Sequence, residues 1–309
     1  MKRRKFIFSS AIIGTLLPFS NILSQKRRKF KISLNPGSIG VSLKLNELAD
    51  IAKKYGYEAI SPNILELKDF TDYEAEKFKE KMDIYNLSWD SAGLPVDFRN
   101  DNSIFRDHLS NLKNYCQTMK KFKVDKLNTW IMPTHKELTY KKNFSLHKNR
   151  ISMISEVIQE FDIKLGLEYV GVRTLMNRDK YPFIHTIDEM RDLIEDIDSK
   201  NIKYQLDSFH WYCSEDSIEK YSFLTNEDIV TVDLNDAVIG RDTKSQIDYE
   251  RELPSKTGVI DIKKFINFLV DIDYNGSVRA EPFNKVLSSM DDENAVKKTY
   301  DYINQSIKI

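Results

Sequence analysis

Short apolar runs alternate with longer segments in which apolar residues recur every three or four positions, from Lys31 to the end of the chain. The segment 45–55 shows the second pattern clearly, because its apolar residues stand at positions i, i+3, i+4 and i+7, namely Leu45, Leu48, Ala49 and Ala52. This spacing is typical of one buried face of a helix. Gly56 then suits the left-handed conformation that often ends a helix. The pattern therefore predicts strands that alternate with amphipathic helices.

Eight strands are predicted, at residues 31–34, 57–61, 87–91, 124–131, 163–168, 202–206, 228–234 and 277–281. Helices are predicted at 45–55, 73–85, 105–122, 146–160, 187–199, 262–272 and 293–307. Such repeats give parallel strands with right-handed crossovers, and about eight units in about 280 residues are typical of a closed barrel. No Gly-x-Gly-x-x-Gly follows the first strand, which argues against a dinucleotide-binding fold. We predict an α/β protein with one (β/α)8 TIM-barrel domain over residues 30–309.

Four consecutive predicted strands end in a carboxylate, namely Glu168, Asp207, Asp233 and Glu281. In barrel enzymes these strand ends meet at one rim, which carries the catalytic residues. One such residue alone is more often a helix cap or an ion-pair partner. Four together would repel one another strongly unless a cation lies between them. Because oxygen ligands favour hard ions, the sequence predicts one bound divalent metal ion, Mn²⁺ or Mg²⁺.

His210 follows Asp207 by three residues and has Trp211 beside it. An imidazole and an aromatic ring just above the strand ends suit hydrogen bonding to, and stacking on, a sugar. We therefore predict that His210 and Trp211 contact the substrate. His185 precedes a predicted helix, and both a role in the substrate site and a plain loop position stay open for it.

The remaining histidines are weaker candidates. His135 lies beyond the end of the fourth predicted strand and is a candidate for the pocket wall, whereas His108 and His147 belong to predicted helices and are expected at the surface. The longest irregular stretch, 235–256, is charged and follows the seventh predicted strand. Loops on that side of a barrel form the mouth of the active site, so this stretch is expected there.

The first 29 residues differ from the rest of the chain, because they carry eight basic and no acidic residues. A mostly apolar stretch at 11–23 follows Arg3-Arg4-Lys5-Phe6-Ile7, a layout that resembles a twin-arginine export signal. The stretch is shorter than the ~20 apolar residues of a spanning helix. Residues 1–29 are therefore predicted to be an export signal of a periplasmic protein with no transmembrane segment in its mature form. An uncleaved signal, which would leave the protein associated with the membrane, stays open.

Charge and cysteine content exclude other classes of protein. Of the 47 basic and 47 acidic residues, 39 basic and 47 acidic ones follow residue 29, which gives that part a net charge of −8. A nucleic-acid partner would require a basic face, so none is expected. Cys116 and Cys213 are too few for a disulfide framework. Both are predicted to be buried free thiols in a fold that depends on core packing.

Three motifs carry a family resemblance: Glu168, Asp207-x-x-His210, and Glu281-Pro282-Phe283. At this spacing they resemble the sugar phosphate isomerase/epimerase barrels of the xylose-isomerase-like superfamily. The resemblance covers essentially residues 31–309. Together the motifs are fairly specific, although Glu-Pro-Phe alone would be a weak signal.

The resemblance implies roles for these residues. In ketose 3-epimerases of that superfamily, two glutamates, an aspartate and a histidine bind Mn²⁺, and the glutamates also exchange a proton with the substrate. By resemblance the glutamates are Glu168 and Glu281, the aspartate is Asp207, and His210 contacts the substrate. Asp233 stands where the metal-binding histidine is expected, which makes the site more anionic. Arg241, in the loop that follows, is a candidate for contacting a substrate hydroxyl.

The function implied is a metal-dependent isomerase or epimerase that abstracts a proton next to the carbonyl of a sugar and passes through an enediolate. A lyase or hydratase acting on keto sugars or keto glycosides would use the same residues and stays open. A sugar-binding barrel without activity is a further alternative, whereas few histidines and an acidic body disfavour a nuclease. Export favours a small sugar without a phosphate group. Whether the chain forms a homo-oligomer stays open.

Overall fold

The computed structural model describes residues 27–308. Most of the predicted export signal, residues 1–26, lies outside the described residues, so the domain boundary after residue 29 stays a prediction. Arg28 forms an ion pair with Glu58 at 2.8 Å, and Lys29 forms one with Asp273 at 3.0 Å. The described chain is therefore attached to the folded domain before the first strand begins.

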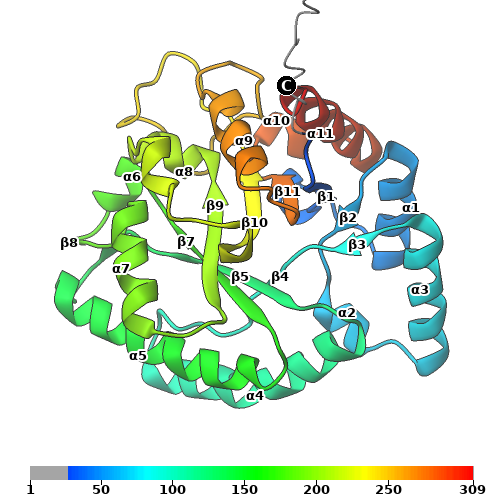
Figure 1. Ribbon diagram of the computed structural model, residues 1–309, viewed down its shortest axis with the longest axis horizontal. Helices are drawn as coiled ribbons and strands as arrows, with labels where there is room; N and C mark the ends of the chain where they lie inside the picture. The colour runs from blue at the N-terminus through cyan, green and yellow to red at the C-terminus, as the bar shows by residue number, and fades with distance from the viewer. Residues whose placement is uncertain (1–26, 309) are drawn as a thin grey trace, which may run out of the picture.

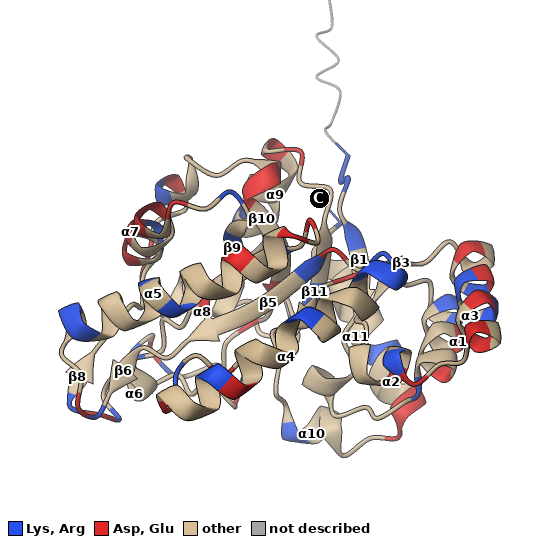
Figure 2. Cartoon of the chain, turned by 90° about the horizontal axis from the view of Figure 1, so that it is seen from below, with Lys and Arg blue, Asp and Glu red and all other residues tan. Residues whose placement is uncertain are grey.

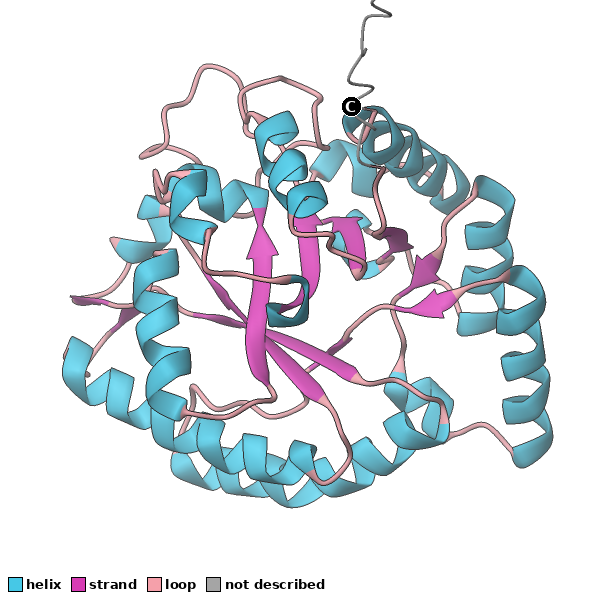
Figure 3. Ribbon diagram, viewed as in Figure 1, coloured by secondary structure: helices cyan, strands magenta, loops and turns pink. Residues whose placement is uncertain are grey.

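A ring of parallel strands forms the centre of the domain (Figures 1 and 3). The strands are β1 (Lys31–Leu34), β2 (Ala59–Ile60), β3 (Ser88–Trp89), β4 (Ala92–Gly93), β5 (Lys126–Ile131), β7 (Lys164–Tyr169), β9 (Ile202–Asp207), β10 (Ile229–Leu234) and β11 (Ser277–Ala280). Neighbours follow the order β3-β2-β1-β11-β10-β9-β7-β5-β4. Only Asp90 and Ser91 separate β3 from β4. The short strands β3 and β4 together serve as the third strand of the barrel, because β3 pairs with β2 and β4 pairs with β5, and this closes the ring. The predicted (β/α)8 barrel is confirmed.

Helices cover the outside of the ring (Figure 3). The longer ones are α1 (Leu45–Tyr55), α3 (Asp72–Tyr85), α4 (Asn102–Lys121), α5 (Tyr140–Gln159), α7 (Ile187–Ile197), α9 (Ile262–Asp271) and α11 (Asp292–Ser306). The connections contain α2 (Ile64–Lys68), α6 (Arg173–Met176), α8 (Ser208–Cys213), α10 (Lys285–Ser288), the 3-10 turns η1 (Gly37–Ile39), η2 (Ile218–Tyr221) and η3 (Asn226–Asp228), and the antiparallel pair β6 (Thr134–His135) and β8 (Tyr181–Pro182). Each long helix buries its apolar stripe in a core shared with the strands.

The helix α5 begins earlier than predicted, at Tyr140. This start places His147 in the middle of the helix, on its inner face, where it is 3% exposed. Its ring packs against Phe98 and Phe183, with centroid distances of 5.4 and 4.8 Å. The prediction that His147 lies at the surface is therefore wrong, and burial lowers its pKa to about 3.

The outer surface carries most of the charge. Both basic and acidic residues occur along α3, for example (Figure 2). Cys116 and Cys213 are both free and buried, as predicted. Within residues 27–308, no helix is long and apolar enough to cross a membrane.

Candidate active site

The barrel brings the four predicted carboxylates to one end of its strands. Glu168 is the last but one residue of β7, Asp207 ends β9, Asp233 is the last but one residue of β10, and Glu281 directly follows β11. In the register of the sheet, Asp233 lies beside Asp207 on one side and beside Arg279 of β11 on the other. Because β7, β9, β10 and β11 are neighbours in the sheet, the ends of these strands place the four carboxylates at one end of the barrel.

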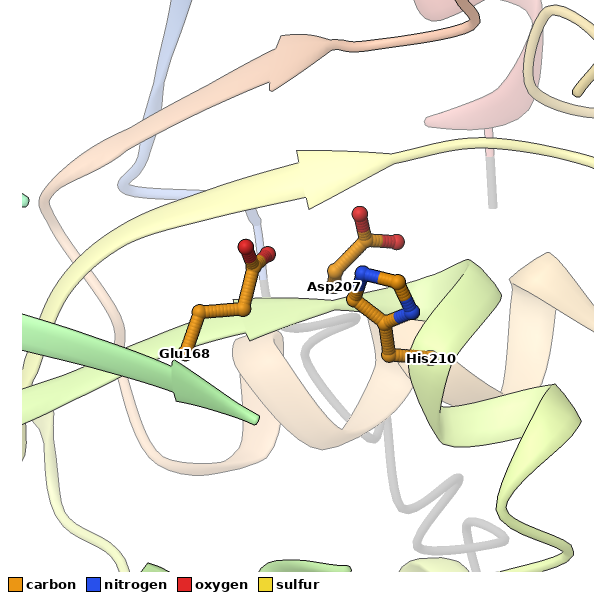
Figure 4. Close-up of side chains that lie close together, drawn as sticks. All are labelled: Glu168, Asp207 and His210. Atoms are coloured by element: carbon orange, nitrogen blue, oxygen red, sulfur yellow. The ribbon is translucent and has the colours of Figure 1, made fainter. Parts of the chain in front are cut away.

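Two overlapping groups of side chains are close enough to share an ion. Ligand atoms of Glu168, Asp207 and His210 lie within 4.8 Å of one another, and the same holds for Glu168, Asp233 and Glu281. Figure 4 shows the carboxyl groups of Glu168 and Asp207 and the ring of His210 turned toward a common space. Glu168 belongs to both groups and therefore lies at the centre of the site.

A buried arginine that the sequence analysis did not single out completes the site. Nη1 of Arg251 donates to Asp207 at 2.8 Å and to Glu281 at 3.3 Å, and Nη2 donates to Asp248 at 2.7 Å. The Arg251 side chain is 2% exposed. Arg251 therefore connects the ends of β9 and β11 through one guanidinium group.

The loop between β10 and α9 delivers Arg251 to the site, because a carboxylate fixes its base. Asp236 accepts four backbone N–H groups at 2.7–3.0 Å, those of Ala237, Thr257, Gly258 and Ile260. Its backbone also pairs with that of Glu252. The charged, irregular stretch predicted at 235–256 is found here. Its composition does not distinguish Arg251 from Arg241, and only the folded loop shows which of the two faces the carboxylates.

The carboxyl groups raise one another's pKa. Burial and the charges of Glu281, Asp207 and Asp233 raise the pKa of Glu168 well above its ordinary value. Burial and the charge of Asp233 likewise raise the pKa of Glu281 to about 8, against the opposing effect of Arg251. Both glutamates therefore hold a proton more tightly than an exposed carboxyl group does.

His210 is neutral in this environment, because burial and the charge of Arg251 lower its pKa to about 3. Its Nε2 lies 3.3 Å from Nη2 of Arg251. A guanidinium group only donates, so we assign Nε2 as the acceptor and place the proton on Nδ1. Nδ1 is buried and has no hydrogen-bond partner within residues 27–308. The site thus contains one buried donor that the described protein leaves unsatisfied.

A cavity of about 160 Å³ lies over these groups. Its polar lining residues are Asn128, Glu168, Arg178, Gln205, His210, Asp248, Arg251 and Glu281. Its other lining residues are Trp130, Met132, Val170, Leu175, Tyr249 and Phe283. A sugar ring fits such a mixed lining, because its C–H faces pack on aromatic rings while its hydroxyl groups form hydrogen bonds with polar groups. The sequence analysis did not single out Trp130, although its place at the end of the fourth predicted strand was a usable signal.

The residues that line this cavity do not include three of the predicted substrate contacts, namely Trp211, His185 and Arg241. Trp211 packs against Phe265 at a centroid distance of 5.4 Å. His185 pairs with Glu189 at 3.0 Å, and Arg241 pairs with Glu250 at 2.6 Å. The pocket candidate His135 is also absent from the lining, and its Nδ1 accepts the N–H groups of the following turn. Substrate contact by these residues stays a prediction, whereas His210 does line the cavity.

The donor set fits a divalent metal ion. Six largely buried carboxyl groups surround the site, namely those of Asp90, Glu168, Asp207, Asp233, Asp248 and Glu281. Among the described residues, two guanidinium groups form ion pairs with them, those of Arg251 and Arg279. Negative charge therefore exceeds positive charge in a buried space, which costs free energy unless the groups take up protons or a cation. Carboxylate oxygens at this spacing are the ligands that hard divalent ions prefer.

Residues 49–306 match the family model described as xylose isomerase-like TIM barrel. The chain belongs to that family. Two curated relatives of the chain are inosose isomerases. The one from Halalkalibacterium halodurans is 22% identical over 264 residues, which cover 82% of this chain and 87% of the relative. The one from Bacillus velezensis is 20% identical over 273 residues, which cover 86% of this chain and 93% of the relative.

Several solved structures share the fold. A xylose isomerase domain protein from Alicyclobacillus acidocaldarius matches with a TM-score of 0.78 and 21% identity, over 90% of this chain and 98% of that one. The IOLI protein, solved with a bound zinc atom, matches with a TM-score of 0.75 and 17% identity over 90% and 98% of the two chains. A D-psicose 3-epimerase solved with D-fructose matches with a TM-score of 0.65 and 16% identity over 89% and 96%. Two inosose isomerases and a sugar epimerase are thus among the proteins that this chain resembles.

Proposed function

We propose that this member of the family is a divalent-metal-dependent sugar isomerase or epimerase that moves a proton on the carbon next to a carbonyl. The supporting observation is that Glu168 and Glu281, from strands separated by β9 and β10, line one cavity with close carboxyl groups and raised pKa values. Two carboxyl groups that can take up and release a proton are what such a reaction requires.

Each residue has a definite task in this proposal. Glu168, Asp207 and Glu281 would hold the ion, and Asp233 is the fourth ligand that the sequence predicts. A bound divalent ion would polarise the substrate carbonyl and stabilise the negative charge that develops beside it. One glutamate removes the proton from the α-carbon, and the other returns a proton on the opposite face. His210 orients the substrate through a hydrogen bond.

We propose a neutral keto sugar or inosose as the substrate. The cations that line the cavity are Arg178 and Arg251. Arg178 pairs with Asp179 at 2.9 Å, and Arg251 pairs with three carboxyl groups. No lining cation of the described chain is thus left for a phosphate or a carboxylate group. The inosose isomerases among the relatives support an uncharged cyclic ketone as the first compound to test.

Proton exchange in D₂O tests the proposal. The metal-loaded protein is incubated with a panel of neutral keto sugars and inososes, and deuterium at the carbon next to the carbonyl is measured by mass spectrometry. Glu168→Gln and Glu281→Gln should each lower the exchange rate by roughly 10²–10⁴, because each removes a general acid–base group. His210→Ala should mainly weaken substrate binding, because the residue orients the substrate and transfers no proton.

The products separate the alternatives. An isomerase or epimerase returns a compound whose mass changes only by the label. Release of a leaving group and an unsaturated sugar identifies a lyase, which uses the same two glutamates. If compounds of the panel bind and none exchanges a carbon-bound proton, the protein is a sugar-binding barrel and the proposed reaction is refuted.

A further inference from the structure

An ion pair lies inside the barrel beside the candidate metal ligands. Asp233 of β10 and Arg279 of β11 are direct neighbours in the sheet register. Nε of Arg279 donates to one carboxylate oxygen of Asp233 at 2.8 Å, and Nη2 donates to the other at 3.2 Å. Asp233 is fully buried and Arg279 is 2% exposed. Because two nitrogens meet two oxygens, the pair has the bidentate geometry of a strong charge-assisted contact.

A second carboxylate holds Arg279 from the other side of the barrel. Nη1 donates to Asp90 at 3.3 Å and to the hydroxyl group of Ser91 at 3.2 Å. The hydroxyl group of Thr231 donates to the other oxygen of Asp90 at 2.9 Å. Arg279 cannot turn away from Asp233 without leaving Asp90, which is 1% exposed, as an unpaired buried charge. The orientation of Arg279 is therefore fixed by two strands besides its own.

The ion pair is connected to the centre of the site through one amide group. Nε2 of Gln205 donates to Asp233 at 2.8 Å and to Glu168 at 3.2 Å. The amide oxygen of Gln205 accepts from Asn128 at 3.0 Å, which sets the orientation of the amide group. The two N–H bonds of Gln205 are thus used for two carboxylates at once, and Asp233 helps to set where Glu168 points.

Asp207 is held differently. Its guanidinium contact is a single one, from Nη1 of Arg251, which belongs to a loop and also reaches Glu281. Asp233, in contrast, has both oxygens bound to a guanidinium group of a barrel strand and one of them bound to Gln205 as well. The other donors to Asp207 are uncharged, namely the backbone N–H of Phe209 at 2.6 Å and Nδ2 of Asn235 at 3.2 Å. An ion at Asp207 would therefore displace one guanidinium contact, whereas an ion at Asp233 would displace two.

We propose that Asp233 is a positioning residue and not a ligand of the metal: paired with Arg279, it fixes Gln205 and thereby Glu168, and Glu168, Asp207 and Glu281 hold the ion. This inference rests on the proposed function, because it needs a bound metal. It revises the role that the sequence predicts for Asp233.

A charge-neutral double substitution tests it, with Mn²⁺ binding measured by titration calorimetry on the full-length protein. D233N/R279Q removes one negative and one positive charge, so a change in affinity does not reflect the net charge. We expect Mn²⁺ binding to weaken by about tenfold or less, the lower end of the effect of groups outside the ligand sphere. The matched control D207N/R251Q is also charge-neutral and removes a ligand, so it should weaken binding by more than about 100-fold.

The outcomes are distinct. Equal losses of affinity in the two double variants overturn the assignment of Asp233 as a positioning residue. Absence of Mn²⁺, Mg²⁺ and Zn²⁺ binding in the wild-type protein overturns the proposed function itself, and this inference with it. If D233N/R279Q does not fold, a crystal structure of the Mn²⁺-loaded wild-type protein decides. An oxygen of Asp233 at about 2.0–2.2 Å from the ion contradicts the proposal, and an intact pair with Arg279 supports it.

Gln205→Met tests the link to Glu168. This variant should weaken Mn²⁺ binding about tenfold in the wild-type background. It should cause little further loss in D233N/R279Q, because the pair acts through Gln205 and the two effects are then not additive. Fully additive losses would show that Asp233 and Gln205 act independently, which contradicts the positioning role.

Discussion

Replacement of Arg251 by methionine tests how far the site depends on one guanidinium group. Arg251 contacts Asp207, Asp248 and Glu281 at 2.8, 2.7 and 3.3 Å and is almost completely buried. Breaking a buried ion pair by removing one partner typically costs about 3–5 kcal/mol. Methionine retains apolar contact with the neighbouring ring of Phe209, so the loss should reflect mainly the charge. At about 2–4 °C per kcal/mol for a domain of roughly this size, the melting temperature should fall by about 6–20 °C.

Thermal melts of the metal-free protein, followed by circular dichroism, measure this fall. Arg241→Met is the matched control, because Arg241 belongs to the same loop and pairs with Glu250 in a contact whose side chains are 32% and 40% exposed. An exposed ion pair contributes about 0–1 kcal/mol, so this variant should melt within about 4 °C of the wild type. Added Mn²⁺ should partly restore Arg251→Met, by about 2.7 kcal/mol at 100 times the dissociation constant. If the two variants melt at the same temperature, Arg251 does not compensate the carboxylates and the reasoning fails.

Two further predictions concern acid stability and export. His147 has a pKa lowered to about 3 by burial, so the unfolded chain takes up its proton first as the pH falls below about 6.5. The free energy of unfolding should therefore fall as the pH drops below 6.5, and His147 should contribute up to about 1.4 kcal/mol per pH unit to this fall. In urea unfolding, His147→Met should show a smaller fall of the free energy of unfolding with pH. An unchanged slope would contradict this. Arg3→Lys with Arg4→Lys should retain the protein in the cytoplasm, as seen by fractionation, whereas export at the wild-type level would indicate a general secretory route.

Alternation of apolar and polar residues was enough to predict the barrel, because strands and helices of this fold differ clearly in period. It also located the four carboxylates, since each follows an apolar strand. The sequence carries a signal for Arg279 and Gln205, because each stands two residues before a predicted ligand, the spacing of side chains on one face of a strand. A charged residue inside an apolar strand therefore calls for a buried partner.

Other features follow from tertiary contacts and have no periodic signal. Arg251 reaches the site because Asp236 closes the base of its loop, and no local pattern encodes that contact. The third barrel strand was predicted as one run at 87–91, whereas Asp90 and Ser91 interrupt it. At these two residues the pairing of the third strand changes from β2 to β5, and the side chains of both residues contact Arg279, which lies far away in the sequence.

The contact between the interrupted third strand and the last strand of the barrel also affects how the chain folds. Asp90 and Arg279 are separated by 189 residues. A contact of such long range forms only after a large loss of chain entropy, so we expect it late on the folding pathway. Interactions absent from the folding transition state set the unfolding rate more than the folding rate. The contact between Asp90 and Arg279, which orders the interior of the barrel, should therefore slow unfolding and so prolong the lifetime of the folded protein.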